Sequence, residues 1–142
     1  MLAALGFVWS LPNTLIGLVL GGLSFVRPRI AQGVLVFDGP PRGITWLLAR
    51  MRRSAMTVGF VIVSNAPVEG TLLAHERAHV RQSMVLGPLF IPAYLVLAVP
   101  FGYRRHPMER AARRAAGEPD ERDAGAGDGR RPIRMTATAR RA

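Results

Sequence analysis

Two long apolar runs dominate the pattern of hydrophobic and polar positions along the chain. The first run, residues 1–26, carries no charged side chain and is followed by Arg27 and Arg29. Its length meets the requirement of about 20 apolar residues for a membrane-spanning helix. It lacks the basic start and the small-residue cleavage site of a signal peptide. We therefore expect residues 1–29 to form a membrane-inserted segment: a kinked span, a short hairpin or a packed pair of helices. A soluble core segment is the alternative.

Residues 30–70 predict short strands and a short helix, separated by turns. Residues 33–37 predict a short strand, and a turn with two prolines follows at 38–41. Residues 44–53 are predicted to be helical, with three arginines at the end that favours positive charge. Residues 56–63 are rich in β-branched and aromatic side chains and predict one strand. This mixture predicts a small α+β unit.

Helical patterns follow, around the second apolar run. A helix is predicted over residues 71–86, where Gly87-Pro88 ends it. The apolar run of residues 89–103 is interrupted by two prolines, which favours broken helices. A further helix is predicted over residues 108–116, with a proline at its start and a glycine after its end. The α+β unit is thus expected to cover residues 30–116, including an apolar hairpin at 86–103.

The composition narrows the possible partners of the chain. It has 142 residues, one domain's worth, and a net charge of +10 that comes from arginine alone. Arginines beside apolar runs suit a surface of anionic lipid. Residues 117–142 have almost no apolar content and are predicted to form a disordered tail. Because this tail mixes acidic residues with arginine and has no aromatic side chains for stacking, nucleic acid is not an expected partner. The absence of cysteine excludes disulfides and thiolate metal sites.

The chemistry of the chain centres on an H-E-x-x-H motif at His75, Glu76 and His79. Two of the three histidines in the sequence belong to it. Residues four apart lie on the same face of a helix, so the two imidazoles can bind one metal ion. Zinc is the usual metal for this spacing, and the neighbouring glutamate can act as a base on zinc-bound water. The alternative is an ordinary amphipathic helix in which the three residues coincide by chance.

A catalytic zinc requires a third protein ligand. The favoured candidate is Glu109, in the first turn of the predicted helix 108–116. His106, the third histidine, is the second candidate. A carboxylate in a first turn is also favoured by the helix dipole, and Arg113 is its i+4 partner, so Glu109 has a purely structural explanation too.

These motifs resemble the gluzincin metallopeptidases. The resemblance lies in the segment HERAHVRQ, a following Gly-Pro with an aromatic apolar stretch, and then a Pro-x-Glu-x-x-Ala helix. It is similar in particular to small, compact, membrane-associated bacterial members, and it covers roughly residues 56–116. The second acid that such sequences often carry two residues after the glutamate is replaced here by Ala111.

The resemblance implies a zincin-like fold of short strands, an active-site helix and a glutamate helix. It implies one Zn²⁺ per chain and a peptide or membrane-proximal protein as substrate. It also implies that the strand at residues 56–63 is a sheet edge that could pair with an extended substrate. The residues it assigns are the general base Glu76 and the zinc ligands His75, His79 and Glu109.

A shared zinc also constrains the membrane topology. A straight helix over residues 86–103 would be about 27 Å long and would separate Glu109 from His79 across the bilayer. Common ligation therefore predicts a re-entrant or interfacial hairpin instead. Arginines precede and follow this run, which predicts that both ends face the cytoplasm at a bacterial inner membrane. The alternative is a non-catalytic membrane protein with a structural or vestigial metal site.

Overall fold

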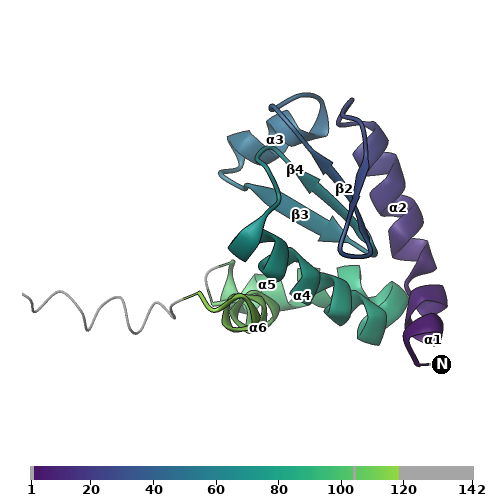
Figure 1. The fold of residues 1–142 in the computed structure, drawn as a ribbon. Helices are drawn as coiled ribbons and strands as arrows, with labels where there is room; N and C mark the ends of the chain where they lie inside the picture. Colours follow the sequence, from purple (N-terminus) through teal and green to yellow (C-terminus); the bar gives the residue numbers. More distant parts are fainter. Residues whose placement is uncertain (1, 104, 119–142) are drawn as a thin grey trace, which may run out of the picture.

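A four-stranded mixed sheet forms the centre of the computed structural model, which describes residues 2–103 and 105–118 (Figure 1). Its strand order is β1-β2-β4-β3. The central pair β2–β4 is parallel, and the outer pairs β1–β2 and β3–β4 are antiparallel. The expected α+β class is therefore confirmed. The strands are β1 (Arg29–Ala31), β2 (Val34–Asp38), β3 (Ala55–Val58) and β4 (Val61–Ser64).

The prediction of one strand over residues 56–63 is wrong. The structure has a tight hairpin there, because the chain reverses at Gly59, whose φ of 64° favours glycine. The β-branched residues continue through the turn, so this glycine is the only local sign of it. As a result, of these two strands only β3 lies at an edge of the sheet, while β4 lies between β2 and β3.

Alternating side chains of the strands build a core on each face of the sheet. One face packs against α4 (Gly70–Leu86), and the other packs against α2 (Leu11–Gly22) and α3 (Ile44–Arg50). This alternation follows from the two-residue period of a strand. The buried side chains on the α4 face are Val34, Val36, Ile62, Val68, Leu73 and Val80, and those on the other face are Phe37, Leu48, Val61 and Val63.

The predicted N-terminal segment forms α1 (Leu2–Trp9) and α2, which follow each other along one side of the molecule (Figure 1). The sheet lies very close to α2, because a Cβ atom at Gly17 would clash with Val58 and one at Gly21 with the Phe37 ring. The buried Asn13 amide donates to the carbonyl of Gly87 at 2.6 Å. Thus the segment packs directly on the predicted α+β unit.

The chain after α4 turns through η1 (Gly87–Leu89) into α5 (Phe90–Phe101). Gly87 has a φ of 53°, a conformation that favours glycine. After this turn α5 returns alongside α4, and the centre of the Tyr94 ring lies 6.4 Å from that of the His79 ring. The expected breaks at Pro92 and Pro100 are absent: α5 runs through both. Pro92 is tolerated because it lies in the first turn, where no helical N–H partner is needed.

One helical stretch of the described chain, Gly70–Phe101, is long and apolar enough to cross a membrane, judged by length and composition alone. It joins α4, η1 and α5. Of its most apolar 18 residues, 11% are buried inside the molecule. The last helix, α6 (Pro107–Ala116), packs against α4. The predicted disordered tail falls almost entirely on residues 119–142, which lie outside the described residues.

Candidate metal centre

Helix α4 presents the H-E-x-x-H motif to the interior of the molecule. His75, Glu76 and His79 are buried, whereas Arg77 and Arg81 point to the surface. The imidazoles and the arginines therefore lie on different sides of this helix. The buried face lies against β3 and α6.

Glu109 completes a compact group with the two histidines. His75 Nε2 lies 3.4 Å from Glu109 Oε2, and His79 Nε2 lies 3.5 Å from Glu109 Oε1. Charge-assisted N–H···O bonds are shorter, about 2.7–2.9 Å. Ligand atoms about 2.0–2.1 Å from a tetrahedral zinc are instead about 3.3–3.4 Å apart. Among the described residues these three form a buried group that could bind a metal ion. The two contacts involve different carboxylate oxygens; with one ligand atom from each residue, the three atoms all lie within 4.8 Å of one another, close enough to share one metal ion.

Hydrogen bonds satisfy the buried Glu109 carboxylate only in part. Its Oε2 atom is buried and has no hydrogen-bond partner in the described chain. Its Oε1 atom accepts a hydrogen bond of 2.6 Å from the Tyr94 hydroxyl. Burial acts to raise the pKa of Glu109, but contacts with His75, His79 and Tyr94 hold this pKa far below its usual range. An ionised, incompletely satisfied carboxylate of this kind suits a metal ligand.

Outer hydrogen bonds orient both imidazoles. His79 Nδ1 lies 2.9 Å from Gln82 Oε1, and His75 Nδ1 lies 3.1 Å from Glu118 Oε1. In the neutral form of each ring, Nδ1–H can donate to this oxygen, which leaves the lone pair of Nε2 for a metal ion at the centre of the group. Gln82 also donates to the Met108 carbonyl at 3.0 Å, which ties α4 to the helix of Glu109.

His106, the other candidate for third ligand, has a structural position instead. It is fully buried and caps the N-terminus of α6, where its Nδ1 accepts from the backbone N–H of Met108 at 3.2 Å. Its Nε2 lies 2.9 Å from the Tyr94 carbonyl and donates to it. Both ring nitrogens are thus used by the backbone, and His106 holds in place the turn that carries Glu109.

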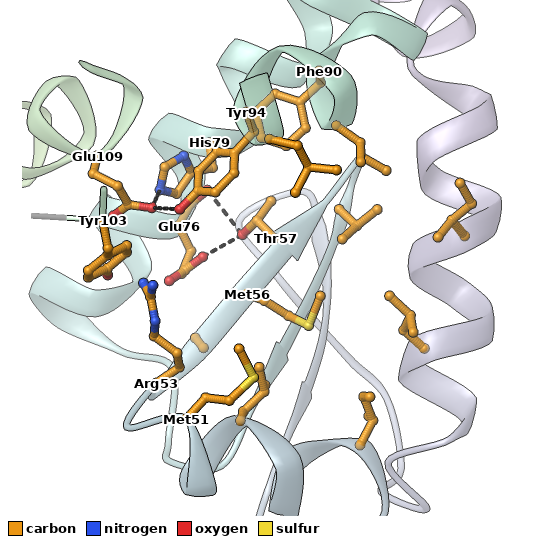
Figure 2. A pocket seen from close by; sticks show the side chains of 18 of the residues that line it. Met51, Arg53, Met56, Thr57, Glu76, His79, Phe90, Tyr94, Tyr103 and Glu109 are labelled. Atoms are coloured by element: carbon orange, nitrogen blue, oxygen red, sulfur yellow. Dashed lines mark hydrogen bonds and ion pairs between the residues drawn. The ribbon is translucent and has the colours of Figure 1, made fainter. Parts of the chain in front are cut away.

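Glu76 lies beside the three possible ligands and contacts the edge strand. The Thr57 hydroxyl on β3 donates to Glu76 Oε2 at 2.6 Å (Figure 2). Burial raises the pKa of Glu76, and the Thr57 hydrogen bond only partly opposes this rise. Such a carboxylate is a stronger base than an exposed one.

A cavity of about 490 Å³ leads to this group along the free edge of β3 (Figure 2). His75, Glu76, His79 and Glu109 lie at its polar end, and apolar side chains of α2, α3, β3 and α5 line most of the rest. Near the polar end the Arg53 guanidinium stacks on the Tyr103 ring. This volume can hold several substrate atoms beside a metal ion.

The structure brings together the sequence-predicted His75, His79 and Glu109, with Glu76 next to them, and leaves His106 outside the group. Three contributors were missed: Thr57, Tyr94 and Glu118. Gln82 ends the segment HERAHVRQ and lies one turn beyond His79 on the same helix face, but its role beside His79 was not predicted. Thr57 and Tyr94 reach the site through tertiary packing and have no sequence signal.

Comparison of the chain with protein-family models, with curated proteins and with solved structures found no match in any of the three. The resemblance to gluzincins therefore stays a prediction that rests on two short motifs. The geometry supports a coarser conclusion: a buried group of two histidines and one carboxylate can hold a metal ion at the polar end of an apolar cavity.

Proposed function

We propose that the protein is a membrane-associated zinc metallopeptidase of the gluzincin type. The observation that carries the proposal is the spacing of His75 Nε2, His79 Nε2 and the Glu109 carboxylate, at 3.4 and 3.5 Å. Two imidazoles and a carboxylate are a common catalytic zinc set, with a fourth position for water or substrate. A second carboxylate, Glu76, adjoins this set and can serve as the base.

The residues around the site have separate roles in the proposed hydrolysis. Zinc in this site supplies Lewis-acid chemistry toward a water molecule and a peptide carbonyl. Glu76 takes a proton from the water and delivers it to the leaving amine. The Thr57 hydrogen bond occupies Glu76 Oε2 and orients the carboxylate, which leaves Oε1 to carry the proton. Tyr94 and Gln82 keep Glu109 and His79 in position.

The proposal includes membrane association because apolar side chains of α1, α2 and α5 point away from the molecule. At about 1.5 Å per residue, the 12 residues of α2 or α5 reach about 18 Å, less than a bilayer core of about 30 Å. We place these helices in one leaflet rather than across the membrane. The arginines near this surface favour the cytoplasmic face of a bacterial inner membrane.

Metal content and hydrolysis together test the function. We expect one zinc per chain by elemental analysis of protein purified in detergent, and loss of the metal in His79→Ala and Glu109→Ala. Glu76→Gln should retain zinc and lose peptide hydrolysis by 100-fold or more, on the order of a general base's contribution. Full zinc with no hydrolysis in the wild type would favour the structural-site alternative, and hydrolysis retained in Glu76→Gln would reject the mechanism.

A further inference from the structure

The mouth of the cavity is built from apolar side chains that line the cavity and also face outward. Ile16, Leu47, Met51 and Leu95 all line it, yet they are 47%, 43%, 60% and 61% exposed. They belong to α2, to α3 and the residue after it, and to α5. The cavity therefore opens between these three helices.

The surface beside this mouth is apolar as well. On α2 the side toward the sheet carries polar and small residues, including Asn13, Thr14, Gly17 and Gly21. A helix on a water-exposed surface has the opposite arrangement. The mouth thus lies within an apolar surface. Exposing a continuous apolar surface of this kind to water is unfavourable. The outward side chains that form this surface are Leu15, Ile16, Leu18 and Val19 on α2, Leu23 directly after it, and Leu95, Val96, Val99 and Phe101 on α5.

In the described part of the chain, few charged side chains line the path from the mouth to the two histidines and two glutamates of the candidate metal centre, called the metal group below. The ionisable side chains that line the cavity, other than tyrosines, are the four at the metal group and Arg53, which is stacked on Tyr103. The apolar side chains of Leu20, Leu48 and Met56 also line the cavity. A charged substrate side chain beside them would lose its hydration without a charged partner, whereas an apolar side chain would be stabilised by burial.

The free edge of β3 identifies the kind of molecule that fits this path. Residues 55–58 all line the cavity, and β3 has a strand partner on one side only. An exposed strand edge offers backbone N–H and C=O groups to another extended backbone. A lipid chain cannot use these groups, but a polypeptide can.

We infer that the substrate is an apolar segment of a polypeptide, which reaches the metal group from the lipid side through the mouth between α2, α3 and α5. This inference rests on the proposed peptidase function. Membrane lipid is the medium through which the segment arrives, and the helices around the mouth set the preference for apolar side chains on either side of the cleaved bond.

A pair of matched peptides tests the inference in detergent micelles. Both peptides share length and scissile residues; one has leucine and valine flanks and the other has serine and asparagine flanks. With the zinc-loaded wild type we expect at least about 10-fold higher kcat/KM for the apolar peptide, in line with the discrimination of apolar pockets. Equal cleavage of the two peptides would overturn the inference.

Two neighbouring substitutions on α5 provide the matched control. Leu95 lines the cavity, whereas Val96 is 69% exposed and does not. Leu95→Gln should reduce the apolar-to-polar ratio of kcat/KM several-fold, and Val96→Gln should leave it unchanged. Because both substitutions lie on the exposed face, neither is expected to prevent folding. An unchanged ratio in Leu95→Gln would count against the proposed entrance.

A binding measurement separates this inference from the proposed function. Zinc-loaded Glu76→Gln should bind the apolar peptide at least about 10-fold more tightly than the polar one, and adding Leu95→Gln should reduce that preference. If the preference is present but the wild type cleaves neither peptide, the cavity binds apolar polypeptide segments as inferred and the peptidase function fails. If cleavage occurs without any binding preference, the function stands and the inference fails.

Discussion

The two ring nitrogens of each histidine in the motif have different partners. Nε2 faces the metal group, and Nδ1–H is fixed by a side-chain oxygen, from Gln82 for His79 and from Glu118 for His75. The identity of the ligands could be predicted from spacing, because four residues make one turn of helix. The outer partner of His75 could not, because Glu118 follows α6 and approaches only after α4 and α6 have packed together.

Gln82→Ala tests the outer partner of His79. Loss of such a partner usually weakens metal binding by about 10–100-fold, because the ring is no longer held in the ligating tautomer. We expect a rise of that size in the zinc Kd, measured by competition with a chelator. Arg81→Ala, at the neighbouring exposed position, should leave the Kd unchanged. An equal effect of both substitutions would contradict a specific role for Gln82.

Asp38 provides a pH-dependent contribution to stability. It accepts from Arg29 Nε at 2.9 Å and from the Val68 backbone at 2.8 Å. The hydrogen bond from Arg29 is the main cause that lowers the pKa of Asp38, against the effect of burial. Because the folded pKa is below the unfolded value of about 3.9, this stability is present above that pH and is lost as the pH falls toward the folded pKa.

Asp38→Asn should therefore lower the free energy of unfolding by about 1–2 kcal/mol at pH 7. The difference from wild type should shrink as the pH falls below about 4. Chemical unfolding in detergent at pH 7 and at about pH 3 measures both values. A difference that does not depend on pH would show that the charge of Asp38 contributes nothing to stability.

At the scale of elements, the close packing of α2 on the sheet decides how the site is enclosed. Helices α3, α4 and α6 were predicted well, because their caps and breaking residues are local, whereas the breaks expected at Pro92 and Pro100 are absent from α5. The hairpin of β3 and β4 was predicted as one strand, because its turn interrupts the apolar pattern only at Gly59. The sheet order was not predicted, since pairing β2 with β4 joins segments that are separated by α3 and β3.

Gly17→Ala and Gly22→Ala compare two glycines on the same helix. A Cβ atom at Gly17 would clash with the Val58 carbonyl and the Val61 side chain, whereas one at Gly22 meets nothing within 4 Å. Gly17→Ala should destabilise the protein by about 1–3 kcal/mol through overpacking. Gly22→Ala should be neutral or slightly stabilising, because alanine has the higher helix propensity. Thermal unfolding in detergent measures both, and similar losses would contradict close packing as the cause.

The whole molecule combines a metal group with an outward apolar surface on the same side as the cavity mouth. From sequence, the two apolar runs predicted contact with lipid, and common ligation by His79 and Glu109 predicted that the second run does not cross. The return of α5 alongside α4 is compatible with that topology. The inverted polarity of α2 could not be foreseen, because in sequence its small and polar residues only interrupt an apolar run.

Single cysteines at Ala49 and Ala111 test the topology, since the chain has none of its own. Both positions are exposed, one before and one after the stretch Gly70–Phe101. In intact inverted membrane vesicles we expect an impermeant thiol reagent to label both to the same extent. If the reagent labels only one of the two cysteines in these vesicles, the two positions lie on opposite sides of the membrane. The stretch then crosses the bilayer, and Glu109 cannot bind the same metal as His79.

The turn at Gly87 has a practical consequence for anyone who wants a water-soluble form of the protein. Its carbonyl is held by Asn13, and the Trp9 indole fills the space beside its α-carbon. Cutting away the first two helices would therefore remove the support of the bend that folds α5, with Tyr94, back over the histidines. Solubility should instead be sought by replacing outward leucines and valines on α2 with polar residues, which leaves every contact around that bend intact.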